Sequence, residues 1–274
     1  AFVRRRLGRE ALDRLVQPLV AGLYSGDPHN LSLKATLPQF LAMEQEHRSL
    51  IAAAWRRRKT DEARIETESS GARFGMFVSL AEGMGALPRA LASSLAAGTV
   101  RLGAAVRRLS RAANGSGWIV DLLNGPPIEA DAVIATTEAH ATARMIDGCD
   151  PSLALQLRAI PYASTIIVNA AYRRDRIRHP LNGFGFVAPA VENRRVLAAS
   201  FLNVKFPDRA PEGTALIRAF IGGGAQPELF DLDDAEVRDL VTSELRQLIG
   251  AEGEPLFLDV ARQPRSMPQY VLGH

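Results

Sequence analysis

The chain has 274 residues, 47% of them hydrophobic and 23% charged, a balance that supports a hydrophobic core and excludes a disordered protein. Its net charge is +3, and residues 1–64 hold 12 Lys and Arg against 7 Asp and Glu, so the basic excess belongs to the N-terminal part. The single cysteine, Cys149, excludes a disulfide framework within the chain, and the five scattered histidines show no metal-ligand spacing, so we assign no metal site.

Residues 1–72 are predicted to form a helical, basic part. Residues 9–24 carry leucine and valine at helical spacing, although Pro18 should kink or end that helix because it lacks an N–H group. A second helix is expected to begin near Pro38 and to run on to the basic sequence at residues 55–59. A polar linker then fills residues 60–72.

The basic end of the second helix has two interpretations. One tryptophan beside a run of cations suits an anionic membrane surface, where the ring lies at headgroup level and the cations attract lipid. A solvated helix end is equally compatible with the same residues. Nucleic-acid binding is not predicted, because aromatic and basic residues do not alternate repeatedly. The candidate membrane-surface residues are Trp55, Arg56, Arg57 and Arg58.

Residues 73–145 are predicted to be rich in β-structure. A helix is expected from the capping pattern Ser79-Leu80-Ala81-Glu82, followed by strands on either side of a turn at 114–117. The run from Asp131 to Thr137 is expected to be a buried strand that ends in small and hydroxyl residues.

Residues 146–274 are predicted to form a mixed or antiparallel sheet packed with helices, so that the whole chain belongs to the α+β class. Short apolar runs predict strands at 196–201, 216–221 and 256–260, and a long uncharged run predicts a strand at 162–172. An amphipathic helix is expected over 233–249, ending at Gly250. A short helix is expected at 151–160.

The stretch from 183 to 224 presents aromatic and aliphatic groups without an acid–base pair. Phe184 lies between two glycines, which allow the backbone to approach another group closely, and Phe220 precedes Gly222-Gly223-Gly224 at a strand end. An ordinary hydrophobic core is the alternative interpretation of these residue types.

Four separated motifs carry a family resemblance: GFGFVAP at 183–189, LAASFLNVKFPDRAP at 197–211, IRAFIGGG at 217–224 and MPQYVLGH at 267–274. Together they resemble the oxygen-dependent, FAD-containing protoporphyrinogen oxidases of the flavin amine-oxidase superfamily. The resemblance implies oxidation of protoporphyrinogen or coproporphyrinogen to the porphyrin in heme biosynthesis, with oxygen as acceptor. It also implies a pocket with Phe184, Gly185 and Val187 on one side and Ser200 and Phe220 on the other; no catalytic residue is assigned.

The same resemblance implies that residues 73–145 are part of an FAD-binding domain, in which Val106 faces the adenine and Ala135 and Thr136 approach the cofactor. The dinucleotide fingerprint G-x-G-x-x-G does not occur in this sequence. The family places that fingerprint before this chain begins and a second flavin segment after it ends. The sequence therefore resembles a central fragment that needs the missing FAD segments, or a homo-oligomeric partner, to retain FAD.

Two alternatives remain open at the level of function. The chain is a substrate- and membrane-binding portion without activity, or it belongs to another flavin amine-oxidase-type enzyme, against which the GFGFVAP and KFPDRAP motifs argue. No run of apolar residues is long enough for a membrane-spanning helix, and Arg4-Arg5-Arg6 does not begin a signal peptide. We therefore expect a cytoplasmic protein with peripheral membrane contact.

Overall fold

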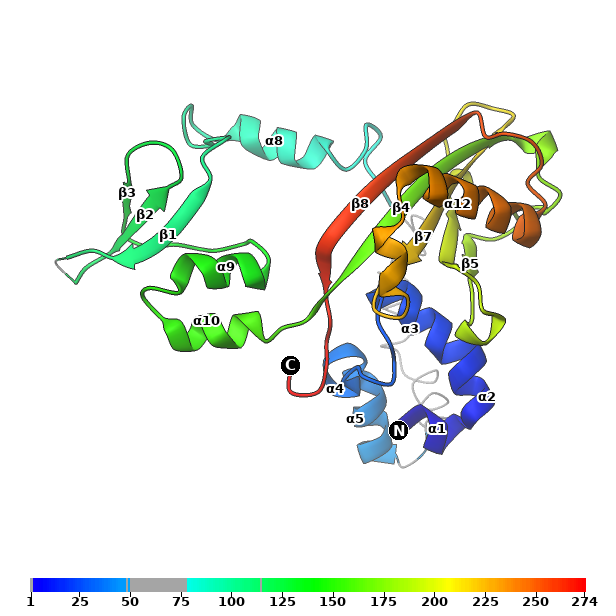
Figure 1. Ribbon diagram of the computed structural model, residues 1–274, viewed down its shortest axis with the longest axis horizontal. Coiled ribbons are helices and arrows are strands. Elements are labelled where there is room, and N and C mark those ends of the chain that lie inside the picture. Colours follow the sequence, from blue (N-terminus) through cyan, green and yellow to red (C-terminus); the bar gives the residue numbers. More distant parts are fainter. Residues whose placement is uncertain (1, 48, 50–77, 114) are drawn as a thin grey trace, which may run out of the picture. The chain divides into compact units, whose positions relative to one another are not determined.

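The computed structural model describes residues 2–47, 49, 78–113 and 115–274, which form two compact units (Figure 1). The first unit joins the described residues up to Val78 with Tyr162–His274, and the second is Ser79–Pro161. Helices and antiparallel sheets occur in both units, so the α+β class is confirmed for the described residues.

The first unit contains helices α1 to α5, α11 and α12, together with strands β4 to β8. Their bounds are α1 Phe2–Leu7, α2 Arg9–Ala11, α3 Gln17–Tyr24, α4 Leu33–Thr36, α5 Pro38–His47, β4 Tyr162–Arg173, β5 Gly185–Val187, β6 Val196–Phe201, α11 Leu202–Lys205, β7 Thr214–Gly222, α12 Asp234–Ile249 and β8 Phe257–Pro268. The second unit contains α8 Ala86–Ser94, β1 Val106–Arg111, β2 Trp118–Leu122, β3 Ile128–Ala130, α9 Ala139–Ile146 and α10 Pro151–Arg158.

A five-stranded antiparallel sheet, ordered β5-β6-β7-β4-β8, organises the first unit. Every second residue of β4 and β7 is buried on one face, which packs against the apolar side of α12 to form the main core. Ile166 and Ile217 on the sheet and Val241 on the helix are fully buried there. The sequence predicted these strands from apolar or uncharged runs bounded by turns, and their alternating burial follows because only one face packs on α12.

Helix α12 begins and ends where the sequence predicted. The Asp233 carboxylate accepts from the Glu236 N–H at 2.9 Å, while the Asp233 N–H donates to the Glu236 carboxylate at 2.8 Å, which completes a capping box. At the other end Gly250 adopts a left-handed conformation with φ of 65°, which ends the helix.

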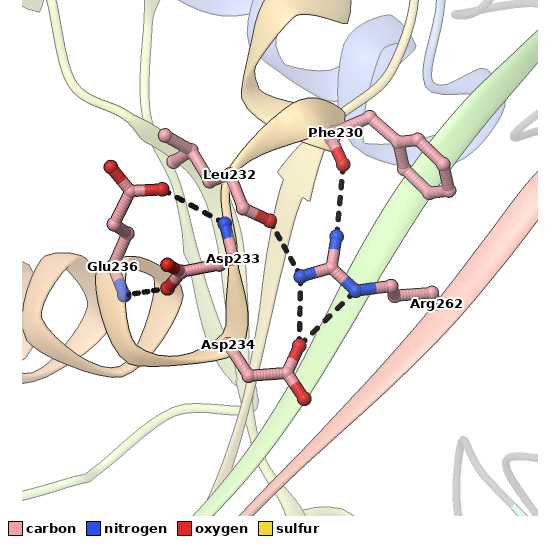
Figure 2. Close-up of polar contacts among 6 residues, drawn as sticks. All are labelled: Phe230, Leu232, Asp233, Asp234, Glu236 and Arg262. Atoms are coloured by element: carbon pink, nitrogen blue, oxygen red, sulfur yellow. Dashed lines mark hydrogen bonds and ion pairs between the residues drawn. The ribbon is translucent and has the colours of Figure 1, made fainter.

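Arg262 fastens β8 to the chain that enters α12 (Figure 2). Its guanidinium donates to the carbonyl of Phe230 at 2.9 Å and to that of Leu232 at 2.6 Å, and it pairs with the Asp234 carboxylate at 2.7 Å. The carbonyls that lead into the helix thus find hydrogen-bond donors in a side chain from the sheet. Strand β8 itself extends to Pro268, well beyond the strand predicted at 256–260.

The helical segment from Arg9 to Tyr24 passes through Pro18 without ending. A π-helical turn over Leu12–Val16 precedes the proline, and the Gln17 N–H donates to the Leu12 carbonyl. The π-helical turn accommodates Pro18, which has no N–H group to donate. The helix therefore widens locally before the proline and does not break there as expected. The second helix begins at Pro38 as predicted.

The second unit packs α9 and α10 on a three-stranded antiparallel sheet. Leu109, Ala143, Ile146 and Ala154 form its small core. Because α9 and α10 pack against each other, the unit continues to Pro161, and the domain boundary predicted between residues 145 and 146 falls inside it, at the end of α9.

Two local expectations in this unit are wrong. The helix predicted from Ser79 begins only at Ala86, since Gly83 takes a left-handed conformation with φ of 85° that interrupts a helix. The segment predicted as a buried strand from Asp131 to Thr137 forms no regular element and is largely exposed, and none of the described strands pairs with it.

Across the part of the chain that the structure describes, no helix is both long and apolar enough to cross a bilayer. The predicted membrane-surface residues Trp55, Arg56, Arg57 and Arg58 lie outside the described residues.

Candidate functional site

The face of the five-stranded sheet opposite α12, here called the second face, carries two adjacent rows of residues. Because antiparallel partners lie directly opposite each other, the strand register places each row across all five strands. The apolar row consists of Val187, Ala198, Phe220, Ile167 and Ala261.

The polar row lies beside the apolar row, two residues further along each strand. It consists of Gly185, Ser200, Arg218, Asn169 and Asp259. Side chains from the two rows are therefore about 7 Å apart along a strand.

Four of the five residues predicted to contact substrate lie in these rows: Gly185, Val187, Ser200 and Phe220. The prediction set Gly185 and Val187 on one side of a pocket and Ser200 and Phe220 on the other. In the structure β5 pairs with β6, so that Gly185 lies directly opposite Ser200, and all four residues share one surface. Their contact with a substrate stays a prediction.

Phe184 lies outside both rows. It precedes β5, its carbonyl accepts a hydrogen bond from the Phe201 N–H at 3.0 Å, and its side chain is 42% exposed. Its position at the edge of the sheet places it beside the rows rather than among them.

Gly185 explains why a glycine follows Phe184. Its φ is 146°, and a Cβ atom at this position would lie 2.0 Å from the Ala199 carbonyl oxygen. Only glycine permits this approach, so the motif joins β5 to the sheet by close backbone contact, as the flanking glycines indicated.

Helix α3 borders the second face along β5 and β6. A Cβ on Gly22 would lie 3.2 Å from Cγ1 of Val187, so the helix approaches the apolar row closely. At the end of α3, the Ser25 carbonyl accepts from the Gly224 N–H at 2.6 Å, and the buried Gln269 donates to the Tyr24 carbonyl at 3.2 Å. The turn predicted at 222–224 and the MPQY segment thus hold this helix beside the sheet.

Arg218 is the residue that sequence reasoning missed. Its Nε donates to Oδ1 of Asn169 at 2.9 Å, and on the far side of the row the Lys205 ammonium lies 3.4 Å from the Ser200 hydroxyl. The sequence of residues 217–220 could have indicated Arg218, because residues two apart on a strand share a face and Phe220 was predicted to face the substrate.

The second unit contains a cavity of about 630 Å³ that brings together all three residues predicted to contact a cofactor. Val106 enters from β1, while Ala135 and Thr136 come from the exposed segment that follows β3. Arg107 and Arg144 also line it, and neither was predicted. Small side chains, exposed backbone and two cations make a site that could receive a flat, partly anionic ligand.

No group of three or more His, Cys, Asp or Glu side chains that could hold a metal ion occurs within the described ranges.

Comparisons with known proteins match nearly the whole chain. Residues 1–266 match the family described as "Flavin containing amine oxidoreductase". The chain is 33% identical over 279 residues to "Coproporphyrinogen III oxidase" of Bacillus subtilis and 29% identical over 292 residues to the mitochondrial "Protoporphyrinogen oxidase" of Nicotiana tabacum. All of this chain is covered in both cases, but only 57% and 58% of the relatives.

Solved structures agree. A crystal structure from Exiguobacterium sp. 255-15, assigned by name to the protoporphyrinogen oxidases, superposes with a TM-score of 0.81 at 26% identity and covers 100% of this chain and 56% of its own. Reduced UDP-galactopyranose mutase, with a TM-score of 0.64 at 13% identity over 98% of this chain and 56% of its own, shares the fold alone. The chain thus spans somewhat more than half the length of the proteins it resembles.

Proposed function

Because the chain belongs to the flavin-containing amine oxidoreductase family, we propose that it supplies the substrate surface for FAD-dependent oxidation of a porphyrinogen to the porphyrin, with oxygen as acceptor, in heme biosynthesis. Relatives named for protoporphyrinogen or coproporphyrinogen III oxidation match the chain at identities from 25% to 33%. The observation that carries the proposal is the second face, where Gly185, Val187, Ser200 and Phe220 lie in two adjacent rows.

The second face suits a flat macrocycle. Phe220 offers a stacking surface, and offset stacking is worth about 0.5–1.5 kcal/mol beyond area burial. Val187 adds an exposed apolar group beside it, whereas Ala198 is buried next to α3, which borders this end of the face. These residues bind and orient the substrate.

The chemistry that FAD supplies when bound is acceptance of a hydride from a methylene-bridge carbon, with reoxidation by oxygen. The cofactor carries the redox step, which is consistent with a second face whose described residues include no acid–base pair at hydrogen-bond distance.

The cavity of the second unit fits part of this cofactor. Its volume of about 630 Å³ lies within the range of small-molecule sites, and its lining combines small side chains near Ala135 with the cations Arg107 and Arg144. Val106, Ala135 and Thr136 would contact the flat, apolar part, and the arginines would favour an anionic group. The sequence contains no G-x-G-x-x-G fingerprint, and the cofactor proposal rests on the lining of this cavity.

Two proposals concern partners and rest on sequence alone. Trp55 and Arg56–Arg58 provide peripheral contact with an anionic membrane from the cytoplasm. Further FAD-domain segments, or a second copy of the chain, complete the cofactor site.

The test is a visible absorption spectrum of the purified protein before and after addition of FAD, followed by porphyrin fluorescence after addition of a porphyrinogen in air. A bound-flavin spectrum and porphyrin formation faster than spontaneous oxidation are expected. Porphyrin binding without flavin uptake would favour the alternative, a binding portion without activity. Flavin uptake with oxidation of amines but not porphyrinogens would overturn the proposal in favour of another enzyme of the family.

A further inference from the structure

We propose that Arg218 binds a carboxylate side chain of the macrocycle at the edge of the second face. This inference rests on the proposed function, since it requires that the second face receives a porphyrinogen.

The position of Arg218 suits a carboxylate at the edge of the ring. It lies on β7 two residues before Phe220, with the buried Ala219 between them, so both side chains emerge from the same face about 7 Å apart. A macrocycle stacked on Phe220 therefore extends its periphery towards Arg218, and the periphery is where a porphyrinogen carries its carboxylates.

Arg218 is anchored but not neutralised. Its Nε donates to Oδ1 of Asn169 at 2.9 Å, while neither Nη group donates to any residue that the structure describes. It forms no ion pair with a described carboxylate. A guanidinium fixed through Nε presents both Nη groups in one plane, the arrangement that donates two parallel hydrogen bonds to a carboxylate.

The surroundings strengthen the attraction. Arg218 is half-buried between β6 and β4, so water screens its charge less than at an exposed site. On the β6 side, the Lys205 ammonium lies 3.4 Å from the Ser200 hydroxyl, in the same row as Arg218. Asp259 lies on the other side of Asn169, two strands away or about 10 Å across the sheet, and is exposed, so it competes weakly.

A structural role for Arg218 is the competing explanation, because the Asn169 hydrogen bond joins β7 to β4 across the sheet. That role predicts a loss of stability on substitution, without any dependence on the carboxylates of the ligand. The ester of the same porphyrin separates the two explanations, since it keeps the ring and removes the negative charges.

The experiment is a fluorescence-quenching titration of the purified protein, with FAD present in the buffer, with coproporphyrin III and with its tetramethyl ester. Arg218→Gln is expected to raise the Kd for coproporphyrin by about 10–100-fold and to leave the Kd for the ester unchanged, because a hydrogen-bonded charge pair is worth about 1.5–3 kcal/mol. Arg218→Lys should recover part of the affinity for the acid. The control is Arg238→Gln, an exposed arginine of α12 on the other side of the sheet, which should change neither Kd.

Asn169→Asp provides a second variant that leaves Arg218 in place. A permanent carboxylate beside the guanidinium should occupy it and weaken coproporphyrin binding, again without an effect on the ester. In steady state, Arg218→Gln should lower kcat/KM for the porphyrinogen at least about tenfold, mainly through KM.

The outcomes keep the two proposals distinct. If the unaltered protein binds no porphyrin, the proposed function fails. If it binds both the acid and the ester but Arg218→Gln affects them equally, or affects neither, the assignment of Arg218 is overturned while the proposed function stands. If Arg218→Gln prevents folding, an Asn169→Asp variant that folds and binds coproporphyrin normally also overturns it.

Discussion

At the residue scale, Phe220 tests whether the apolar row binds a ligand or only packs. Its side chain is half-buried on the second face, whereas Ile217, three residues earlier on the same strand, is fully buried in the main core. Phe220→Ala should raise the Kd for a porphyrin about threefold to tenfold through loss of stacking, with a small loss of thermal stability.

Ile217→Ala is the matched control for Phe220→Ala. Because it leaves a cavity in the core, it should cost about 2–5 kcal/mol of unfolding free energy. The two variants are compared by denaturant unfolding and by porphyrin titration. Equal losses of stability and of binding in Phe220→Ala would mean that Phe220 is a core residue and not part of a binding surface.

Gly185 provides a backbone test at the same scale. A methyl group there would meet the Ala199 carbonyl oxygen at 2.0 Å, on a backbone whose φ of 146° L-residues rarely adopt. Gly185→Ala should therefore weaken the pairing of β5 with β6 and cost roughly 1–3 kcal/mol or more in denaturant unfolding.

Gly183→Ala serves as the control, because a Cβ at position 183 meets no atom within 4 Å. The prediction is a stable Gly183 variant and a destabilised Gly185 variant with lower amide protection in β5. Similar stability of the two variants would contradict the prediction, because it would mean that the pairing of β5 with β6 does not require glycine at position 185.

Motif resemblance predicted Val187 and Phe220 as pocket residues, and their contact with a substrate stays a prediction. Their place in one row across the sheet could not be predicted, because the pairing of β5 with β6 is a non-local contact. Arg218 was missed since a charged residue in an apolar strand gives no motif of its own, although its spacing from Phe220 places both on one face.

At the element scale, the capping box of α12 is the clearest stability test. The Asp233 carboxylate satisfies the Glu236 N–H, and the helix packs the core side of the sheet. Asp233→Ala should lower the unfolding free energy by about 1 kcal/mol, because one N–H at the helix start loses its partner.

Asp239→Ala is the comparison, as Asp239 is exposed within the same helix. It should change stability by less than about 0.5 kcal/mol in the same unfolding experiment. If both variants lose the same free energy, the effect comes from helix charge rather than from the cap.

Elements with strong local signals were predicted well. Helix α12 has periodicity, a cap and a terminal glycine, and β4 is a long uncharged run bounded by turns, so local sequence sufficed for both. The helix expected from Ser79 failed because a capping pattern gives no information on the left-handed Gly83 that follows it. The strand expected at 131–137 failed because an apolar run forms a buried strand only where another strand pairs with it.

At the scale of the whole molecule, the sequence predicted three parts and the structure has two units. The N-terminal helices and the C-terminal sheet belong to one unit, and the hydrogen bond from the Gly224 N–H to the Ser25 carbonyl joins residues that are distant in sequence. Composition shifts detect linkers but not such contacts, which is why residues 1–72 were assigned to a separate domain.

The uneven charge of the chain gives the last prediction. Lys and Arg outnumber Asp and Glu by 12 to 7 over residues 1–64, and Arg56, Arg57 and Arg58 contribute most of that difference beside Trp55. Replacing the three arginines by glutamine should weaken binding to anionic phosphatidylserine vesicles by up to about a hundredfold, since each cation near such a surface is worth about 1 kcal/mol. Binding is measured by vesicle co-sedimentation at low and at physiological salt.

The control replaces three exposed arginines outside this segment, Arg195, Arg238 and Arg246, by glutamine, which makes the same change in net charge. If the Trp55 segment docks on the membrane, the first variant loses far more binding than the control and its residual binding depends less on salt, because fewer charges meet the lipid. Equal losses would mean that binding to anionic lipid depends on net charge alone. The arginines beside Trp55 would then be solvated cations without a specific role in membrane binding. Binding to neutral vesicles that survives in both variants would instead assign the contact to apolar groups, among which Trp55 is the first to replace.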